Sequence, residues 1–398
     1  MKRLHNEDYG PHSRLGAAGR GLTMGILFSA PQYEFDIIRE EWLKSVQQIA
    51  KNGVFVGGPA VSGFESSFAS YTGSAGAVGV GSGTDALFLA LKALGIGPGD
   101  EVITVSNTFI ATVNAINHTG ARPVLVDCDR SSYLIDLEQV KACVTSRTKA
   151  IIPVHLYGQM TDLRELAPWA EAQGIAVIED CAQAAGARLF GKAAGSWGIM
   201  GCFSFYPDKN LGALGDGGAI ISSSPEILTK LRKLRNHGGE ARYQHEMPGF
   251  NSRLDPIQAA ALQIKLRYLE EWSQRRREIA GWYDKYLQDT DSVILPKDSN
   301  ASHVYHLYVI RIDNGRRDEL KKHLQKKGIL TAVQYPVPIH LTPAYSSLAY
   351  AEGAFPNSEK FAGEILSLPM HIALSEEETA AVASEIKSFL NVNKKMLV

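Results

Sequence analysis

Apolar and polar residues alternate along most of the chain in a way that separates short strands from longer helices. The apolar runs at 101–106, 122–129, 149–158 and 175–180 have the length of strands, and amphipathic segments lie between them. Strands that alternate with helices of about 10–15 residues are typical of βαβ units. The pattern therefore predicts an α/β fold with a mixed, mostly parallel sheet flanked by helices.

The N-terminal part follows a different pattern. Residues 1–27 contain no apolar stretch of the kind found in secretory signals, and we interpret them as a flexible extension, with Met24 as a second candidate start. Between 36 and 52 the apolar residues fall at helical spacing. This spacing predicts a helix whose apolar stripe packs on a partner surface.

The C-terminal part also departs from the βαβ pattern. An amphipathic helix is predicted over 267–287, followed by a strand at 303–312, a charged helix at 316–328, a strand at 329–335 and a last helix at 376–391. This order predicts a smaller α+β domain that covers a cleft. We therefore expect a large domain over 28–270, which includes an N-terminal interface segment, and a small domain over 271–398.

Composition and charge exclude several classes of protein. The chain has 398 residues, of which 45% are hydrophobic and 21% charged, with a net charge of −1. Such a balance gives no reason to expect nucleic acid or a membrane as a partner. No apolar run approaches the roughly 20 residues that span a bilayer. The four cysteines show no metal-binding spacing, so we expect no metal and a reducing cytoplasmic location.

Asp180 and Lys209 are charged residues that end or closely follow predicted buried strands. Asp180 ends the apolar run 175–180, and in open α/β sheets ligands bind at the carboxyl ends of strands. Lys209 follows a strand-like run at 200–206 in a glycine-rich segment, where desolvation lowers the pKa of the amine and frees it as a nucleophile toward carbonyl groups. A buried ion pair between the two side chains is the structural alternative.

A second candidate site is the turn Gly81-Ser82-Gly83-Thr84. It lies between a short apolar strand and a helix rich in Ala and Leu, so free N–H groups at the helix N-terminus are expected to bind phosphate. A dinucleotide fingerprint needs a third glycine and an acid near the end of the next strand, but Glu101 opens that strand. A single phosphate is the better fit.

The blocks around these residues resemble a known family. VIEDCAQAAGA and SFYPDKNLGALGDGGA are similar to the two signature blocks of the DegT/DnrJ/StrS sugar aminotransferases, which are pyridoxal phosphate (PLP) enzymes of fold type I. Further blocks such as TFIAT, NSRLDPIQAA and YPVPIHLTPAY occur in the family's order, from about Phe28 to the C-terminus. The resemblance implies the aspartate aminotransferase-like fold and PLP as the cofactor.

The resemblance also assigns roles to individual residues. It implies that Lys209 binds the cofactor covalently and moves the proton, that Asp180 pairs with the pyridine nitrogen and that Gln183 lies near the phenolic oxygen. The other implied cofactor contacts are ring stacking and phosphate binding, from Phe109, Gly83, Thr84, Ser204 and, across a dimer interface, Asn251. The implied contacts to the sugar or its nucleotide are Tyr243, His245 and His340.

The function that the resemblance implies is amino sugar biosynthesis for an antibiotic or a polysaccharide. A homodimer with shared active sites would transfer the amino group of L-glutamate to a keto sugar. The segment KNLGALGDGGA resembles members that act on nucleotide-linked 3-keto-6-deoxyhexoses, so a dTDP-linked sugar is expected. The alternatives are a transaminase for a keto sugar phosphate, a UDP-keto-uronate or a cyclitol, and a non-catalytic sensor that binds PLP or a sugar.

Overall fold

The computed structural model describes residues 25–241, 243–298 and 300–392. Within them, seven strands form a central sheet in the order β1-β9-β8-β5-β4-β2-β3. Their bounds are β1 (Gly76–Val80), β2 (Glu101–Val105), β3 (Arg122–Val126), β4 (Thr148–Ile152), β5 (Ala176–Asp180), β8 (Met200–Ser204) and β9 (Gly218–Ser222). A separate short ribbon pairs β6 (Arg188–Leu189) with β7 (Lys192–Ala193).

The direction of the strands brings several loops to one edge of the sheet. Neighbours from β8 to β3 run parallel, whereas β9 is antiparallel to both β8 and β1. Since β1 is antiparallel to β9, it runs in the same direction as β8. The carboxyl ends of all strands except β9 therefore meet at the same edge. The expectation of a mixed, mostly parallel sheet is confirmed.

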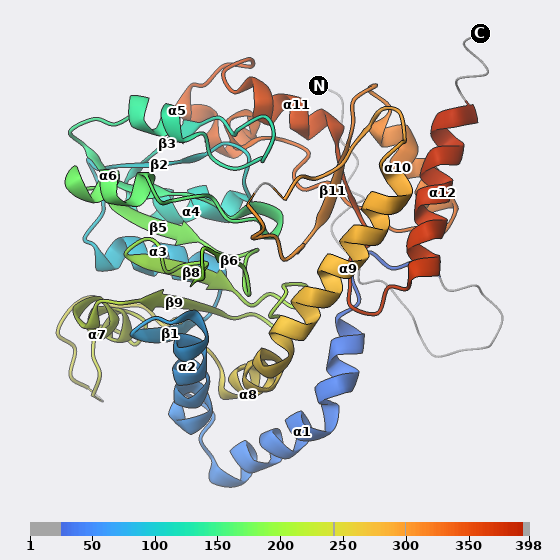
Figure 1. The fold of residues 1–398 in the computed structure, drawn as a ribbon. Coiled ribbons are helices and arrows are strands. Elements are labelled where there is room, and N and C mark those ends of the chain that lie inside the picture. Colours follow the sequence, from blue (N-terminus) through green and yellow to red (C-terminus); the bar gives the residue numbers. More distant parts are fainter. Residues whose placement is uncertain (1–24, 242, 299, 393–398) are drawn as a thin grey trace.

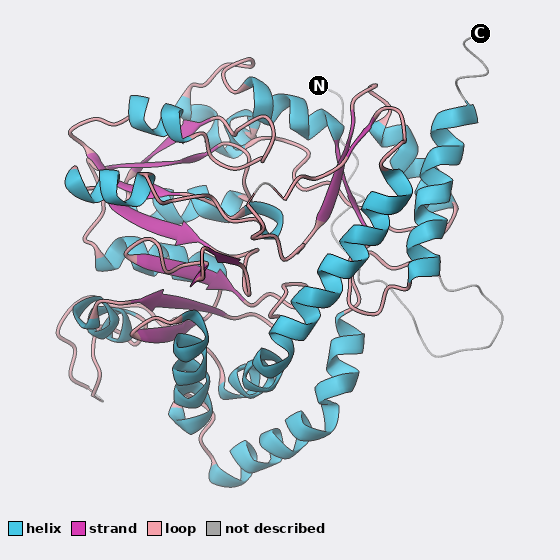
Figure 2. Cartoon of the chain, viewed as in Figure 1, coloured by secondary structure: helices cyan, strands magenta, loops and turns pink. Residues whose placement is uncertain are grey.

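Helices cover both faces of this sheet (Figure 2). Two successive residues of β9 show that both faces are buried. Ile221 packs with Phe64 and Phe203 on one face, and Ile220 packs with Leu87 on the opposite face. Around the sheet lie α1 (Pro31–Asn52), α2 (Gly58–Thr72), α3 (Gly83–Ala93), α4 (Ile110–Thr119), α5 (Leu137–Ala142), α6 (Leu166–Ala172), α7 (Pro225–Leu234) and α8 (Pro256–Lys265).

The long helix α9 (Leu269–Leu287) leads from the central sheet to a smaller group of elements (Figure 1). That group contains an antiparallel sheet of β10 (Val293–Ile294), β11 (Tyr308–Ile312) and β12 (Ile365–Leu368). Its helices are α10 (Arg317–Lys326), α11 (Pro356–Glu364) and α12 (Glu376–Val392). It has its own apolar core, in which Tyr283, Ile310, Leu324 and Ile386 take part.

Two of the predicted strands differ from the structure. The strand expected over 303–312 begins only at Tyr308, because Tyr305 has a φ of 43° and the backbone at Val304 and Leu307 bonds to residues 157–158 instead of a strand. The strand expected over 329–335 is wrong. In the described residues this stretch forms only isolated bridges at Ile329 and Ala332, and β12 occupies the place in the sheet beside β11.

The expected domain boundaries stay a prediction. Residues 1–24 of the proposed N-terminal extension lie outside the described residues. None of the helices in the described part of the chain combines the length and the apolar composition needed to cross a bilayer.

Candidate active site

Asp180 occupies the last position of β5, at the edge where the parallel strands end. Its side chain is buried, with Oδ2 accepting a hydrogen bond from Thr112 Oγ1 at 2.8 Å and Oδ1 accepting one from the N–H of Ala182 at 3.1 Å. Burial raises the pKa of the carboxyl, whereas these two donors and the charge of Lys209 lower it. The carboxylate is therefore held in place but not neutralised by a direct ion pair.

Lys209 lies in the loop that follows β8, within the electrostatic reach of Asp180. Part of its side chain stays open to solvent, yet desolvation lowers the pKa of its amine to about 8, against the opposing charges of Asp180 and Asp208. Asp208 instead accepts a hydrogen bond from Ser29 Oγ at 2.9 Å. Among the described residues Lys209 Nζ has one polar contact, to His306 Nε2 at 3.5 Å, so the buried ion pair is not formed.

The turn between β1 and α3 lies against the end of β8, and we call this place the cradle. Ser82 caps α3 by accepting a hydrogen bond from the N–H of Asp85, which leaves the N–H groups of the first turn directed out of the helix. A Cβ added at Gly83 would lie 2.6 Å from the Cβ of Ser204, so only glycine fits there. This close approach brings the end of β8 beside the N-terminus of α3, and the two elements together fit an anion.

An aromatic pair and an amide lie close to Asp180. Phe109 precedes α4 and is 52% exposed, and its ring centroid lies 5.5 Å from that of Tyr335. Gln183 donates its Nε2 hydrogen to the Tyr335 hydroxyl at 3.0 Å and accepts one from the N–H of Tyr157 at 2.6 Å. Burial raises the pKa of Tyr335, and the charge of Asp180 adds to this shift. Tyr335 was missed by the sequence reasoning, although it opens the same YPVPIH block that contains His340.

His340 lies next to this region but is fully engaged. It is 3% exposed, with Nδ1 bonded to Ser106 Oγ at 2.8 Å and Nε2 to Glu359 Oε1 at 2.9 Å. Its ring also packs edge-on against Phe355. A contact between His340 and a sugar would require one of these hydrogen bonds to open, so the geometry favours a supporting role.

The remaining expected residues lie in the loop between α7 and α8. Tyr243 is 79% exposed, and His245 donates from Nδ1 to the carbonyl of His237 at 2.9 Å. Asn251 is also exposed, and it pairs with Asn236 in an isolated bridge. In the described part of the chain neither His245 nor Asn251 is hydrogen-bonded to Lys209 or Asp180. The residue after Asn251 does reach the turn before α3, because Ser252 Oγ accepts a hydrogen bond from the N–H of Gly81 at 3.0 Å and donates one to Asp85 Oδ2 at 2.7 Å.

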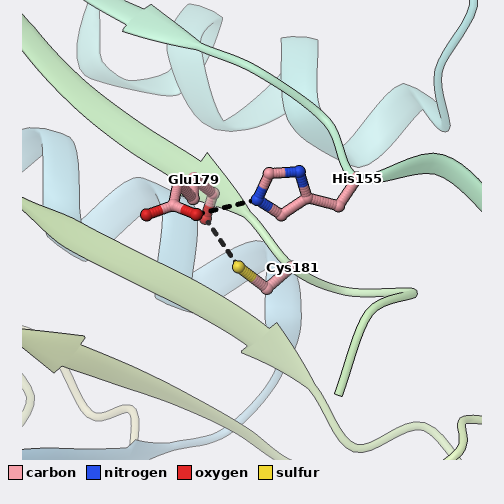
Figure 3. A group of neighbouring side chains, drawn as sticks. All are labelled: His155, Glu179 and Cys181. Atoms are coloured by element: carbon pink, nitrogen blue, oxygen red, sulfur yellow. Dashed lines mark hydrogen bonds and ion pairs between the residues drawn. The ribbon is translucent and has the colours of Figure 1, made fainter. Parts of the chain in front are cut away.

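A buried cluster of His155, Glu179 and Cys181 adjoins the site (Figure 3). The N–H of Thr161 donates to His155 Nδ1, so the ring proton is on Nε2 and is donated to Glu179 Oε2 at 2.8 Å. The Glu179 carboxylate also accepts three backbone N–H groups, those of Gly195, Trp197 and Gly198. With both His155 nitrogens occupied, the cluster anchors the end of β5 beside Asp180 and does not offer the ligands of a metal site.

The chain is similar to known proteins over most of its length. Residues 36–387 match the model of the DegT/DnrJ/EryC1/StrS aminotransferase family. A dTDP-3-amino-3,4,6-trideoxy-alpha-D-glucose transaminase of Streptomyces venezuelae is 42% identical over 94% of this chain and 98% of its own length. A protein of Geobacillus stearothermophilus called pleiotropic regulatory protein is 44% identical, over 92% of this chain and 99% of its own.

A solved structure is similar over the same extent. The Streptomyces venezuelae enzyme DesV, in complex with a ketimine intermediate, superimposes with a TM-score of 0.90 at 42% identity. The match covers 92% of this chain and 99% of that one.

Proposed function

The chain belongs to the DegT/DnrJ/EryC1/StrS aminotransferase family, and from this premise we propose that it transfers the amino group of L-glutamate to a nucleotide-linked keto sugar. It is a PLP-dependent aminotransferase with the fold type I architecture. The observation that carries the proposal is the meeting of Asp180, Lys209 and the Gly83–Ser204 cradle at one edge of the sheet.

The residues at this edge fit PLP in three respects. The cradle offers free N–H groups to a phosphate. Gly83, which has no side chain, allows the N-terminus of α3 to lie close to Ser204. The half-exposed ring of Phe109 offers a face for stacking. The amine of Lys209, with a pKa lowered to about 8, can add to a carbonyl group. We assign the phosphate contacts to Gly83, Thr84 and Ser204.

When bound, PLP supplies a carbonyl group that exchanges amino groups and a ring that accepts electrons from the bond that is broken. Asp180, held by Thr112 and Ala182, keeps a proton on the ring nitrogen by pairing with it as a carboxylate. Gln183, fixed by Tyr157, orients the ring's hydroxyl side. Lys209 would hold the cofactor through its amine, and the freed amine would carry a proton between substrate atoms.

We propose that the enzyme is a homodimer in which Asn251 reaches the phosphate of the neighbouring site. The family resemblance of the block NSRLDPIQAA and the exposure of Asn251 in the single chain support this assignment. Tyr243 and His245 in the same exposed loop are the proposed contacts to the sugar. We assign His340 a supporting role, in which it connects Ser106, just after β2, with Glu359 of α11. Residues 28–270 are the proposed cofactor domain and 271–398 the smaller domain. A cytoplasmic location stays a prediction.

A dTDP-linked 3-keto-6-deoxyhexose is the proposed acceptor. The block KNLGALGDGGA and the 42% identity to a transaminase named for a dTDP-3-amino sugar support it. A keto sugar phosphate, a UDP-keto-uronate or a cyclitol is the alternative acceptor. The name of the Geobacillus relative favours a regulatory protein as the second candidate function, and turnover separates the two.

The test is the near-visible absorption spectrum of purified protein loaded with PLP, recorded before and after L-glutamate is added. We expect a band from the lysine-bound cofactor that glutamate converts to that of pyridoxamine phosphate. Lys209→Ala should lose both the band and turnover, whereas Lys322→Ala, on the exposed side of α10, should keep them. A wild-type spectrum without a covalent band would contradict the assignment of Lys209. A band without turnover on any keto sugar would favour the regulatory function.

A further inference from the structure

The irregular segment 303–307 passes beside Lys209 and is tied down at both ends. The N–H of Val304 donates to Gly158 O at 3.0 Å, and its carbonyl accepts from Asn210 Nδ2 at 3.0 Å. The N–H of Leu307 donates to Tyr157 O at 3.2 Å. Because Asn210 is the next residue after Lys209, these bonds fix the position of His306 relative to the lysine.

His306 differs from His155, His303 and His340 in what it contacts. His155, His303 and His340 each form a hydrogen bond between a ring nitrogen and a neighbouring residue. His303, for example, accepts one from the N–H of Tyr305. His306 is 8% exposed, and in the described residues its only side-chain hydrogen-bond contact is Lys209 Nζ, at 3.5 Å from Nε2. Its Nδ1 is buried with no partner there. A buried polar atom without a partner is costly. The ring nitrogens of His371 are also without a partner in the described residues, so the contact with Lys209 is what distinguishes His306.

The charges around His306 keep its ring neutral. Burial lowers the pKa of His306 well below 6.5, and the positive charges of Lys209 and Arg276 and the neighbouring His303 lower it further. The carboxylates of Asp180 and Asp208 act on Lys209 and favour its protonated form. The neutral ring therefore carries one proton, and the side that faces the ammonium must be the unprotonated Nε2.

We propose that His306 is a positioning residue for Lys209, whose Nε2 accepts a hydrogen bond from Nζ and holds the amine in place while it is not bonded to the cofactor. This inference rests on the role proposed for Lys209. The ring does not serve as the base in turnover, because it does not take up a proton near neutral pH. It instead supplies the acceptor that the half-enclosed ammonium lacks, and it restricts the rotation of a long, flexible side chain.

Three variants separate this role from a structural one. His306→Phe keeps a flat ring without an acceptor, and His306→Gln places an amide oxygen near the position of Nε2. His303→Asn is the matched control, since its Oδ1 can accept from the N–H of Tyr305 as His303 Nδ1 does, and His303 has no hydrogen bond to Lys209. The readout is the rate at which acetic anhydride labels Lys209 in the cofactor-free enzyme, followed across pH by mass spectrometry.

We expect the labelling midpoint of the wild type near pH 8. His306→Phe removes the acceptor that stabilises the ammonium, so its midpoint should fall by about one pH unit. Above both midpoints, covalent attachment of PLP should slow about tenfold, because the free amine is no longer oriented. His306→Gln and His303→Asn should retain the wild-type midpoint. A folded His306→Phe with an unchanged midpoint and attachment rate would overturn the proposal.

A second measurement does not depend on the folding of a variant. In wild-type protein with ¹⁵N-labelled histidine, the nitrogen shifts of His306 should report a neutral ring protonated at Nδ1 at pH 7. A protonated Nε2 would refute the hydrogen bond that we propose. If wild-type Lys209 neither labels selectively nor attaches PLP, the proposed function fails. If it does both and His306→Phe behaves in the same way, only this inference fails.

Discussion

At the scale of single residues, the site is a balance between desolvation and charge. Burial acts in opposite directions on the two central groups, raising the pKa of Asp180 and lowering that of Lys209 to about 8. Asp180 accepts hydrogen bonds from Thr112 and Ala182, and Lys209 contacts His306. The two charged groups therefore do not pair with each other, and each can interact with a ligand. The charge of the neighbour Asp208 also raises the lysine's pKa, while its carboxylate accepts a hydrogen bond from Ser29.

Replacing Asp180 by Asn tests the carboxylate at the ring nitrogen. The amide keeps the size of the side chain but removes its charge, so kcat should fall about 100-fold while PLP remains covalently attached. Steady-state kinetics and the absorption spectrum measure the two effects separately. Thr112→Val, which removes one donor to Asp180, should cause a smaller loss. Wild-type kinetics in Asp180→Asn would refute the role.

Buried histidines predict how stability depends on pH. Burial lowers the pKa of His303 to about 3 and that of His371 to about 4, and that of His306 well below 6.5. The unfolded chain binds protons at these rings below about pH 6.5 and the folded chain does not, so their contribution is full above that pH and is lost as the pH falls.

The free energy of unfolding should therefore fall by about 1.4 kcal/mol per pH unit for each ring between about pH 6 and pH 4. Urea unfolding measured across this range gives the slope. His371→Phe should reduce this slope by the contribution of one ring. His118→Gln, at the exposed end of α4, should leave the slope unchanged. Parallel slopes for wild type and His371→Phe would contradict the neutral state of His371.

At the scale of elements, α1 is held against the sheet's helices by an unusual contact. Lys265 of α8 and Glu34 of α1 form a buried ion pair with Nζ and Oε2 2.9 Å apart, and Ile38 packs beside it against Ala261. The other side of α1 exposes Ile37 and other large apolar side chains. The ion pair therefore helps to position a helix whose outer face is exposed in the described residues.

Glu34→Leu should destabilise the protein by about 3–5 kcal/mol, because it leaves the ammonium of Lys265 buried without a counter-charge. Adding Lys265→Met removes that charge, so the double variant should recover most of the loss. Urea unfolding of both variants measures this. A Glu34→Leu protein as stable as the wild type would show that the pair does not hold α1.

At the scale of the whole molecule, the exposed apolar surface fits the homodimer that we propose. Tyr33, Ile37, Leu43, Phe55 and Val56 are each more than two-fifths exposed along α1 and the loop after it. Clustered apolar surface of this kind is typical of interfaces. Asn251 is also exposed, and no hydrogen bond joins it to Lys209 in the described residues. The proposed homodimer would cover the apolar surface and bring Asn251 to the neighbouring site.

Mixed dimers test the shared site. Lys209→Ala and Asn251→Ala should each be impaired alone, the second through weaker PLP binding. A heterodimer of the two, purified through different tags, contains one site with both residues intact if Asn251 acts across the interface. Activity should then return to about half that of the wild type. A heterodimer no more active than the sum of its parents would place Asn251 in its own subunit's site.

Much of this arrangement was predictable from local pattern. The strand that ends at Asp180, the glycine turn before α3 and the long helix α9 follow from apolar periodicity, since each depends on residues close together in the chain. The family blocks added the cofactor and the lysine. The strand expected over 329–335 failed because its apolar pattern also suits an irregular segment, and only pairing with another strand decides between the two.

The tertiary structure alone decided which side chains meet. The contact of His306 with Lys209 joins residues 97 positions apart, and that of Gln183 with Tyr335 joins residues 152 apart. The hydrogen bond between His340 and Ser106 likewise joins residues 234 apart. The sequence determined the elements and the chemistry at their ends, because these are local properties. The partners of each polar group, and hence its pKa, depend on how the elements pack.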